Sequence, residues 1–254
     1  MKVCVLSSGS KGNVTYLEVN NKKFLLDAGR NYKYIKDTLA DIGVNVCDID
    51  YIIISHNHTD HISALKKLII NTDATIIISQ KQLFEIEDIN DYSHILICED
   101  EIFIDDIKII SFKSSHDAVD ARNFVIESNN SKIGYVTDTG YVNTKNFKYL
   151  KNLDVYLFES NHDIELLQHG PYPAWLKMRV LSDEGHLSNK LAAFYLSKFI
   201  GTNTKKIILI HLSETNNLES IAMETINNTF LDKGINFNNI ICARQEEKTE
   251  VVEV

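Results

Sequence analysis

The residues best suited to chemistry lie in one short stretch, positions 54–61, which reads ISHNHTDH. Three imidazoles and a carboxylate fall within six residues there, directly after the apolar segment 51–54. His56 and His58 are two positions apart, so on an extended backbone both side chains point to the same side. Imidazole suits zinc and other first-row metals, and the carboxylate of Asp60 adds a harder ligand beside His61. A lone histidine would fit a plain polar loop, but four ligand-type residues in this order predict a metal site.

Three more residues of ligand type follow apolar runs later in the chain. His116 comes shortly after the run that ends at Phe112, Asp138 follows residues 132–137, and His211 ends the run 206–211. Each alone has a structural explanation, as a satisfied histidine at a sheet end or as a turn aspartate. Because sites form where loops converge at strand ends, the three together are predicted to complete one large site.

The elements that must position these residues can be read from the pattern of apolar residues and turn residues. We expect strands at 3–6, 15–19, 23–27, 51–54, 74–79, 102–104, 107–112, 124–127, 132–137, 155–159, 206–211, 239–243 and 251–254, with turns at 20–21 and 129–131. We expect helices at 32–42 (stopped by Gly43), from Ile62 onward, and at 81–89, 189–199 and 218–230. Strands grouped in each half, with helices interspersed, favour an α/β plan of two sheets with helices outside.

Composition limits the alternatives. The chain has 254 residues, 44% of them hydrophobic, which is enough for one large domain or two small ones. No Pro/Gly-rich linker divides it, and we expect residues 1–254 to form a single domain. The N-terminus is typical of a first strand and not of a secretory signal, and no apolar run reaches the roughly 18 residues of a membrane span. The four cysteines, Cys4, Cys47, Cys98 and Cys242, are interpreted as reduced core thiols of a cytoplasmic protein.

The charge pattern and a few isolated side chains give further expectations. The net charge of −9 gives no support for a broad basic nucleic-acid surface, although a local patch around Lys177 and Arg179 is compatible with it. His94 and His169 are expected to be surface residues. The segment 171–175, PYPAW, is predicted to be a packed irregular segment, with a substrate-side loop as the alternative.

The ligand order His56-x-His58-x-Asp60-His61, then His116, Asp138 and His211, resembles the seven-ligand set of dinuclear metallo-β-lactamase-fold hydrolases over nearly the whole chain. The resemblance implies an αββα four-layer sandwich with the metals at one edge of the two sheets. It implies that His56, His58 and His116 hold one metal, that Asp60, His61 and His211 hold the second, and that Asp138 bridges them.

Two aspartates refine what this resemblance implies. A bridging carboxylate at Asp138 suits phosphoesters, whereas true lactamases of this fold usually have cysteine or serine there, so β-lactam hydrolysis is disfavoured. Asp27 matches the family's early aspartate, which would orient a ligand histidine. Its alternative role is that of a turn residue at a strand end.

Three further segments, FESNHD at 158–163, LSDEGHLSN at 181–189 and HLSETNN at 211–217, resemble the YycJ/WalJ family. Those bacterial proteins are regarded as 5′→3′ DNA exonucleases or related phosphodiesterases. The resemblance implies that His186 contacts the scissile phosphate and acts as general acid, and that Asn161 and His162 line the substrate groove. The interval between Asp138 and His211 leaves no room for the inserted domain of β-CASP nucleases.

Four other residues are assigned to the substrate side, each with a structural alternative. Ser188 and Asn189 lie beside His186, but either would also serve as a helix N-cap. Ser8 and Asn13 belong to the Gly/Ser-rich loop 7–13, whose small residues let backbone N–H groups approach a phosphate. The same loop is equally explained as an ordinary turn.

The sequence therefore predicts a dinuclear metal-dependent phosphodiesterase, with a 5′→3′ DNA exonuclease as the first hypothesis. Two divalent ions, zinc, manganese or iron, would activate water and clamp the phosphate. Asp60 and His186 are the predicted catalytic residues, with His186 protonating the leaving oxygen. One alternative is a small-molecule or cyclic-nucleotide phosphodiesterase, which is compatible with the acidic net charge. The other is a non-catalytic metal-binding regulatory protein, against which the complete ligand set counts. The oligomeric state is not predicted.

Overall fold

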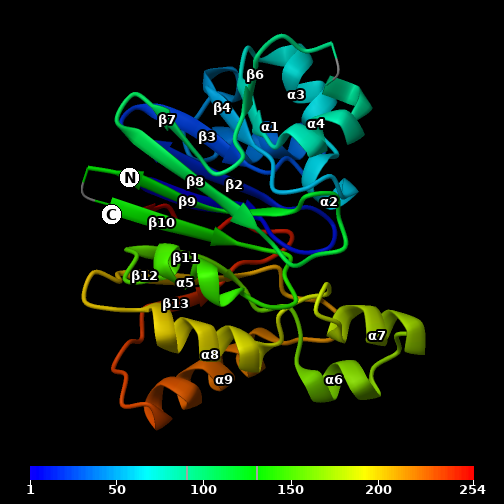
Figure 1. Cartoon of the computed structure of the whole chain (residues 1–254), viewed down its shortest axis with the longest axis vertical. Coiled ribbons are helices and arrows are strands. Elements are labelled where there is room, and N and C mark those ends of the chain that lie inside the picture. The colour runs from blue at the N-terminus through cyan, green and yellow to red at the C-terminus, as the bar shows by residue number, and fades with distance from the viewer. Residues whose placement is uncertain (90, 130) are drawn as a thin grey trace.

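The computed structural model of the chain describes residues 1–89, 91–129 and 131–254. Two seven-stranded sheets face each other, and helices cover both outer faces (Figure 1). The strand order is β14-β1-β2-β3-β4-β5-β6 in the first sheet and β13-β12-β11-β10-β9-β8-β7 in the second. The predicted α/β fold, an αββα four-layer sandwich, is confirmed.

The bounds of the elements are as follows. The first sheet holds β1 (Lys2–Ser7), β2 (Val14–Val19), β3 (Lys22–Leu26), β4 (Tyr51–Ile53), β5 (Thr75–Ile78), β6 (Ile95–Ile97) and β14 (Val252–Glu253). The second holds β7 (Glu101–Ile104), β8 (Ile107–Lys113), β9 (Arg122–Ser128), β10 (Ser131–Val136), β11 (Val155–Glu159), β12 (Lys206–Ile210) and β13 (Ile240–Cys242). The helices are α1 (Tyr32–Ala40), α2 (Thr59–Ile62), α3 (Leu65–Asn71), α4 (Gln80–Glu85), α5 (Phe147–Leu150), α6 (Ile164–His169), α7 (Ala174–Leu181), α8 (Asn189–Phe199) and α9 (Glu219–Asp232), with short 3₁₀ turns at Val46–Asp48, Glu87–Ile89 and Thr144–Asn146.

Both sheets combine antiparallel hairpins with parallel strands. In the first sheet β1, β2 and β3 pair antiparallel, and β3 to β6 pair parallel. In the second, β7 to β10 pair antiparallel, and β10 to β13 pair parallel. Strands β8 and β10 point toward the end of the molecule that carries α2 and α7, whereas both chain termini lie at the other end (Figure 1). Loops that leave these strand ends therefore meet at one edge of the sandwich.

Alternation along the strands explains the four layers. Val3 and Val5 of β1 belong to the apolar core between the two sheets, whereas Cys4 and Leu6 pack outward toward α1. The second sheet has the same two-faced pattern, with an outer core that includes Leu196 of α8. Because both faces of the central parallel strands are buried, β4, β5, β11 and β12 are apolar along most of their length.

Several predicted boundaries were wrong around the helices. The helix expected from Ile62 begins instead at Thr59, so Asp60 and His61 lie in its first turn, with His58 as the N-cap residue. A carboxylate there is favoured by the helix dipole. The helix expected at 81–89 is the shorter α4 followed by a 3₁₀ turn. β6, α5, α6 and α7 were not predicted. The predicted turn at 129–131 includes position 130, which lies outside the described residues.

Two predictions about packing were also wrong. Residues 171–175 are not a packed irregular segment, because Pro173 precedes α7 and the Trp175 side chain is 64% exposed. All four cysteines are free, but Cys47 is exposed on the 3₁₀ turn at Val46–Asp48, where Val46 takes the buried position. His94 and His169 are exposed, as expected. Among the described residues, no helix is both long enough and apolar enough to span a membrane.

Candidate metal centre

The seven predicted ligands meet in one cluster at the strand ends. Their nitrogen and oxygen atoms form sets whose members lie within 4.8 Å of one another: His56 with His58 and His116; His56 with His61 and Asp138; and Asp60 with His61 and His211. A further set joins Asp138 and His211 to Glu159 and His186. The first and third sets are the two triads expected for two metals. They come from loops after β4, β8, β10 and β12, so both sheets contribute.

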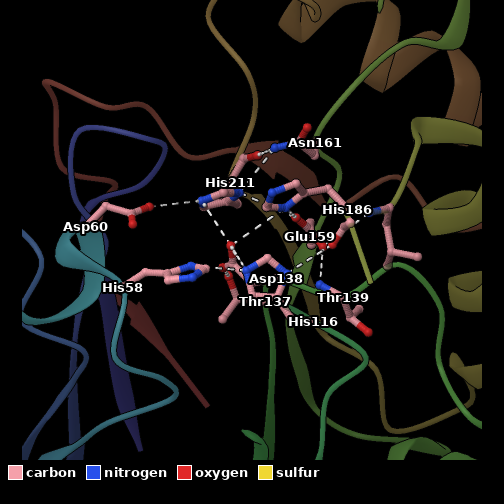
Figure 2. Close-up of polar contacts among 12 residues, drawn as sticks. His58, Asp60, His116, Thr137, Asp138, Thr139, Glu159, Asn161, His186 and His211 are labelled. Carbon is pink, nitrogen blue, oxygen red and sulfur yellow. Dashed lines mark hydrogen bonds and ion pairs between the residues drawn. The ribbon is translucent and has the colours of Figure 1, made fainter. Parts of the chain in front are cut away.

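Asp138 lies between the two triads (Figure 2). Its Oδ1 is 3.8 Å from His116 Nε2 and 3.5 Å from His211 Nε2, and its Oδ2 is 3.3 Å from His61 Nε2. The residue is 2% exposed. One carboxylate thus faces histidines of both triads, which is the placement that a bridging ligand requires.

The histidine rings fit a metal because their outer nitrogens are held by protein groups. His61 Nδ1 is 2.7 Å from Asp27 Oδ2, His116 Nδ1 is 3.2 Å from the Gly185 carbonyl, and His211 Nδ1 is 3.4 Å from Glu159 Oε1. The opposite nitrogen of each ring faces the cluster. The Nε2 atoms of His56 and His211 are buried without any hydrogen-bond partner. Such oriented rings, combined with carboxylates, fit divalent first-row metal ions.

The electrostatics of the cluster also call for cations. Burial opposes protonation of His211, but Asp138, Asp60 and Glu159 outweigh burial and raise its pKa to about 10. The same competition, led by Asp138 and Asp27 against burial, holds the pKa of His61 well above its usual value. In the metal-free protein, protons on these two rings balance the carboxylates, and divalent ions would displace them.

Asp27 anchors the second triad from behind. Its carboxylate accepts hydrogen bonds from the Ser55 N–H (2.7 Å), the Ser55 hydroxyl (2.8 Å) and the Tyr135 hydroxyl (2.8 Å), besides its contact with His61 Nδ1. It is 0% exposed. Asp27 thus contacts a ligand-type histidine, as the sequence suggested, while Tyr135 and Ser55 were missed.

His186 lies against the cluster without belonging to either triad. Its ring stacks on His211, with centroids 5.1 Å apart and planes 17° apart, and its Nδ1 is 2.7 Å from Glu159 Oε1 (Figure 2). Glu159 is 0% exposed and also accepts the Thr139 N–H at 2.9 Å. Sequence reasoning gave Glu159 no role, although a carboxylate ending the otherwise apolar strand 155–159 was a usable signal.

With this geometry in hand, comparison with known proteins decides the family. The sequence profile of the Metallo-beta-lactamase superfamily matches residues 8–95. The chain is 35% identical to the exodeoxyribonuclease YycJ of Bacillus anthracis, over 91% of this chain and 89% of that protein. It is 38% identical to the exodeoxyribonuclease WalJ of Streptococcus pneumoniae, over 89% of this chain and 87% of that protein.

The chain belongs to the YycJ/WalJ family. Solved structures agree on the fold of this YycJ/WalJ family member. YhfI from Bacillus subtilis superposes with a TM-score of 0.75 at 15% identity over 98% of both chains. Zinc-bound PqqB from Methylobacterium extorquens superposes with a TM-score of 0.71 at 11% identity, over 98% of this chain and all of that one.

The six residues assigned to the substrate side in this YycJ/WalJ chain are all buried. The exposed fractions of Ser8, Asn13, Asn161, His162, Ser188 and Asn189 reach at most 8%. His162 is 1% exposed, and burial lowers its pKa to about 4. Asn161 Nδ2 donates to the His211 carbonyl at 2.9 Å. Packing behind His211 encloses Asn161 and His162, and the expectation that they line the substrate groove stays a prediction.

The other four support the site through internal hydrogen bonds. Ser188 caps α8 by accepting the Leu191 N–H, which is the alternative left open by the sequence. The Asn189 side chain bonds Ser160 and Asn217, and the Ser8 hydroxyl accepts the His211 N–H at 2.7 Å. Asn13 Nδ2 lies 3.3 Å from Asp60 Oδ2 and 3.0 Å from His61 Nε2. Direct contact of these residues with a substrate stays a prediction.

Proposed function

We propose that this protein is a metal-dependent exodeoxyribonuclease that uses two divalent ions and degrades DNA from the 5′ end. The observation that carries the proposal is the meeting of two ligand triads at one buried carboxylate, Asp138, with His186 beside them. The YycJ and WalJ relatives named exodeoxyribonucleases, at 35% and 38% identity over about nine tenths of the chain, support DNA as the substrate.

In this proposal His56, His58 and His116 hold one ion, Asp60, His61 and His211 hold the other, and Asp138 contacts both. When bound, two divalent ions activate water and offset charge on the phosphate oxygens. Zinc, manganese and iron all suit a donor set of imidazole and carboxylate. Asp60 is the most exposed of the three ligands of the second ion, since its side chain is 25% exposed against 5% for His211 and 0% for His61.

His186 acts as the general acid in this scheme. The contact of its Nδ1 with the buried carboxylate of Glu159 fixes the ring and leaves Nε2 as the atom that exchanges a proton. In this scheme the proton on Nε2 goes to the leaving oxygen. The side chain of His186 is 12% exposed, which gives it access that the buried residues around it lack.

The proposal also covers the domain organisation and the cellular location of the protein. Residues 1–254 act as one catalytic domain, which is supported by the pairing of β14 with β1 at the two ends of the chain. A cytoplasmic location is supported by the four free cysteines.

The test is an exonuclease assay on single- and double-stranded DNA labelled at the 5′ or the 3′ end, with manganese or zinc supplied. The proposal expects early release of labelled mononucleotide from the 5′ label only, and loss of activity after chelation. Cyclic nucleotides and bis-p-nitrophenyl phosphate run in parallel. If the protein hydrolyses cyclic nucleotides but no DNA, it is a small-molecule phosphodiesterase and not an exodeoxyribonuclease.

A further inference from the structure

Two surface recesses with opposite charge flank the candidate metal centre. The first, of about 510 Å³, begins at Ser8 beside His211 and is lined by one arginine, Arg244, and by four glutamates, Glu214, Glu219, Glu246 and Glu247. The second, of about 460 Å³, lies at the end of β8 and is lined by Lys81, Lys113, Arg122, Lys145 and Lys148 with three carboxylates. In a chain of net charge −9, the excess of basic side chains makes the second recess a place suited to a polyanion.

The carboxylates of this lysine-lined recess are largely committed to its buried arginine. Arg122 Nη2 contacts Glu99 Oε2 and Asp120 Oδ2 at 2.5 and 2.6 Å, and Lys113 Nζ is 3.4 Å from Asp120 Oδ1. Lys81, Lys145 and Lys148 are exposed and form no ion pair with any residue in the described ranges. Three positive charges are therefore free to meet phosphate groups.

An aromatic ring lies among these lysines. Tyr149 is half-buried, stacks on Phe112 with centroids 5.8 Å apart, and has Lys148 Nζ 4.6 Å from its ring centroid. Both rings line the recess. A basic groove with an aromatic ring among its charges is a combination by which proteins bind single-stranded nucleic acid, since charges follow the backbone and rings stack on bases.

The recess is also close to the metal centre. Lys113 ends β8 and stands three residues before His116, so the two α-carbons are at most about 11 Å apart. Charges along one DNA strand are about 3.4 Å apart in the axis direction of the duplex. A strand lying from the metal centre to the recess would thus span only a few nucleotides.

We propose that this lysine-lined recess binds the backbone of a single DNA strand a few nucleotides from the reactive phosphodiester, with Tyr149 stacking on a base. The inference rests on the proposed exonuclease function and adds how the enzyme holds the rest of its substrate. The patch expected at Lys177 and Arg179 is a poorer candidate. Arg179 is bound to both oxygens of Asp117, and Lys177 Nζ donates to the Gln168 carbonyl.

The test compares two triple variants of the metal-loaded protein. Lys81→Ala/Lys145→Ala/Lys148→Ala removes the free charges of the recess, and Lys36→Ala/Lys67→Ala/Lys233→Ala removes three exposed lysines elsewhere. Binding of a long phosphorothioate single strand is measured between about 50 and 200 mM salt. The slope of log affinity against log salt is negative, and each lost phosphate contact makes it shallower by about 0.7. The slope of the recess variant should therefore be shallower than that of the wild type by about 2. The control should keep the wild-type slope.

Two further readouts separate the parts of the proposal. The recess variant should keep the wild-type kcat and KM on thymidine 5′-(p-nitrophenyl phosphate), which is too short to reach the recess, and show a raised KM on the long strand. Tyr149→Leu should weaken strand binding several-fold at an unchanged salt slope. An unchanged slope in the recess variant, or equal losses on both substrates, overturns the inference. Failure of the wild-type protein to cleave any DNA would instead overturn the exonuclease function itself.

Discussion

At the scale of single residues, the site is built with strained backbone. Asp27, Asp138 and His211 each follow a strand directly or within two residues, and each has a left-handed φ of 61°, 47° and 57°. Such a conformation costs about 1–2 kcal/mol for a residue with a Cβ atom. It persists where surrounding contacts over-determine it, as the hydrogen bonds on Asp27 do. The gain is that all three side chains reach one cluster at the strand ends, where Asp27 and Asp138 contact His61 and Asp138 contacts His211.

His186→Ala should retain both metals and slow hydrolysis. A general acid contributes about 10²–10⁴-fold, and its loss should matter most for a nucleoside leaving group and least for p-nitrophenolate, which departs without a proton. The measurements are the metal content and the kcat on two substrates, a DNA strand with a nucleoside leaving group and a p-nitrophenyl phosphodiester. Glu159→Gln is the companion variant, because it leaves His186 in place and removes the charge that holds it.

Two results would contradict this role for His186. A uniform loss on both esters would assign the residue to phosphate binding. Loss of a metal ion in the variant would move the ring into the ligand shell and overturn the pairing of His211 with the second ion.

Asp138→Asn should abolish phosphodiesterase turnover in a protein that stays folded. Asparagine tolerates the left-handed backbone, so the change removes charge and leaves the turn intact. Two neighbouring cations without their shared anion repel each other, and metal analysis should show fewer than two ions per chain. Circular dichroism checks the fold. Full metal content with an unchanged rate would reduce Asp138 to a turn residue.

At the scale of elements, close packing of backbone fixes where α2 presents its ligands. A Cβ atom on Gly29 would lie 1.6 Å from the Asp60 carbonyl oxygen, so no other residue fits at this position. Hydrogen bonds reinforce the contact, because the Ala28 N–H donates to the His61 carbonyl and the Asn13 N–H donates to that of Asp60. The loop after β3 thus acts as a template for the first turn of α2.

Gly29→Ala should therefore displace Asp60 and His61 and weaken metal binding by about 10–100-fold, as the loss of a supporting contact does. Titration with zinc or manganese measures the affinity. Gly43→Ala is the matched control, since Gly43 has φ +76° but open space around it. It should lower stability by about 1–2 kcal/mol and leave the metal affinity intact. Equal metal affinity in the two variants would refute the template.

The sequence predicted well those strands that are buried on both faces and those helices that have one apolar face. It predicted the other elements poorly. The strands around Val3 and Val5 were recognisable because both sheet faces are apolar, and α8 because its apolar face repeats with helical period. α7 was missed because its large apolar side chains Trp175 and Met178 are exposed, so the segment has no buried apolar face that repeats with helical period. α2 was placed late because its start is set by His58 and by the contact with Gly29, not by apolar residues.

Some residues of the site could be predicted from the sequence and others could not. Ligand order was visible because residue type and spacing alone carry it, as at His56 and His58. Tyr135 and Glu159 were not, because each lies in an apolar strand and acquires its role from a contact with another element. Tyr135 of β10 reaches Asp27 beyond β3 in the opposite sheet, and Glu159 of β11 reaches His186 before α8. Such contacts depend on how two sheets face each other, which periodicity does not encode.

At the scale of the whole molecule, the metal centre joins the two sheets. One sheet supplies His56, His58, Asp60 and His61, whereas the other supplies His116, Asp138 and His211. Ions bound there add cross-links at the edge of an apolar interface that extends between the sheets. Binding energy for the ions is therefore also folding energy, and it grows with the logarithm of the ratio of free metal to its dissociation constant.

Removal of the metals should make stability fall with pH. In the metal-free protein the pKa of His211 is about 10, against about 6.5 in an unfolded chain. Because the pKa is raised in the folded state, the proton on His211 contributes its full stabilisation to the folded protein below about pH 6.5. As the pH rises from there toward 10, the free energy of unfolding falls by roughly 1.4 kcal/mol per pH unit for this one proton. Bound metals take the place of the proton, so the loaded protein should lack this decline.

Urea unfolding of chelator-treated and manganese-loaded protein at a series of pH values from about 6.5 to 10 measures the difference. The gap between the two unfolding free energies should widen with pH, because only the metal-free cluster must keep protons on His211 and His61 to offset Asp60, Asp138 and Glu159. Asp138→Asn provides an internal check, since one carboxylate fewer weakens the demand for those protons and should flatten the metal-free curve. Parallel pH curves for the two wild-type forms would show that the imidazoles and carboxylates do not share protons, and with that the electrostatic case for two cations at this edge would fail.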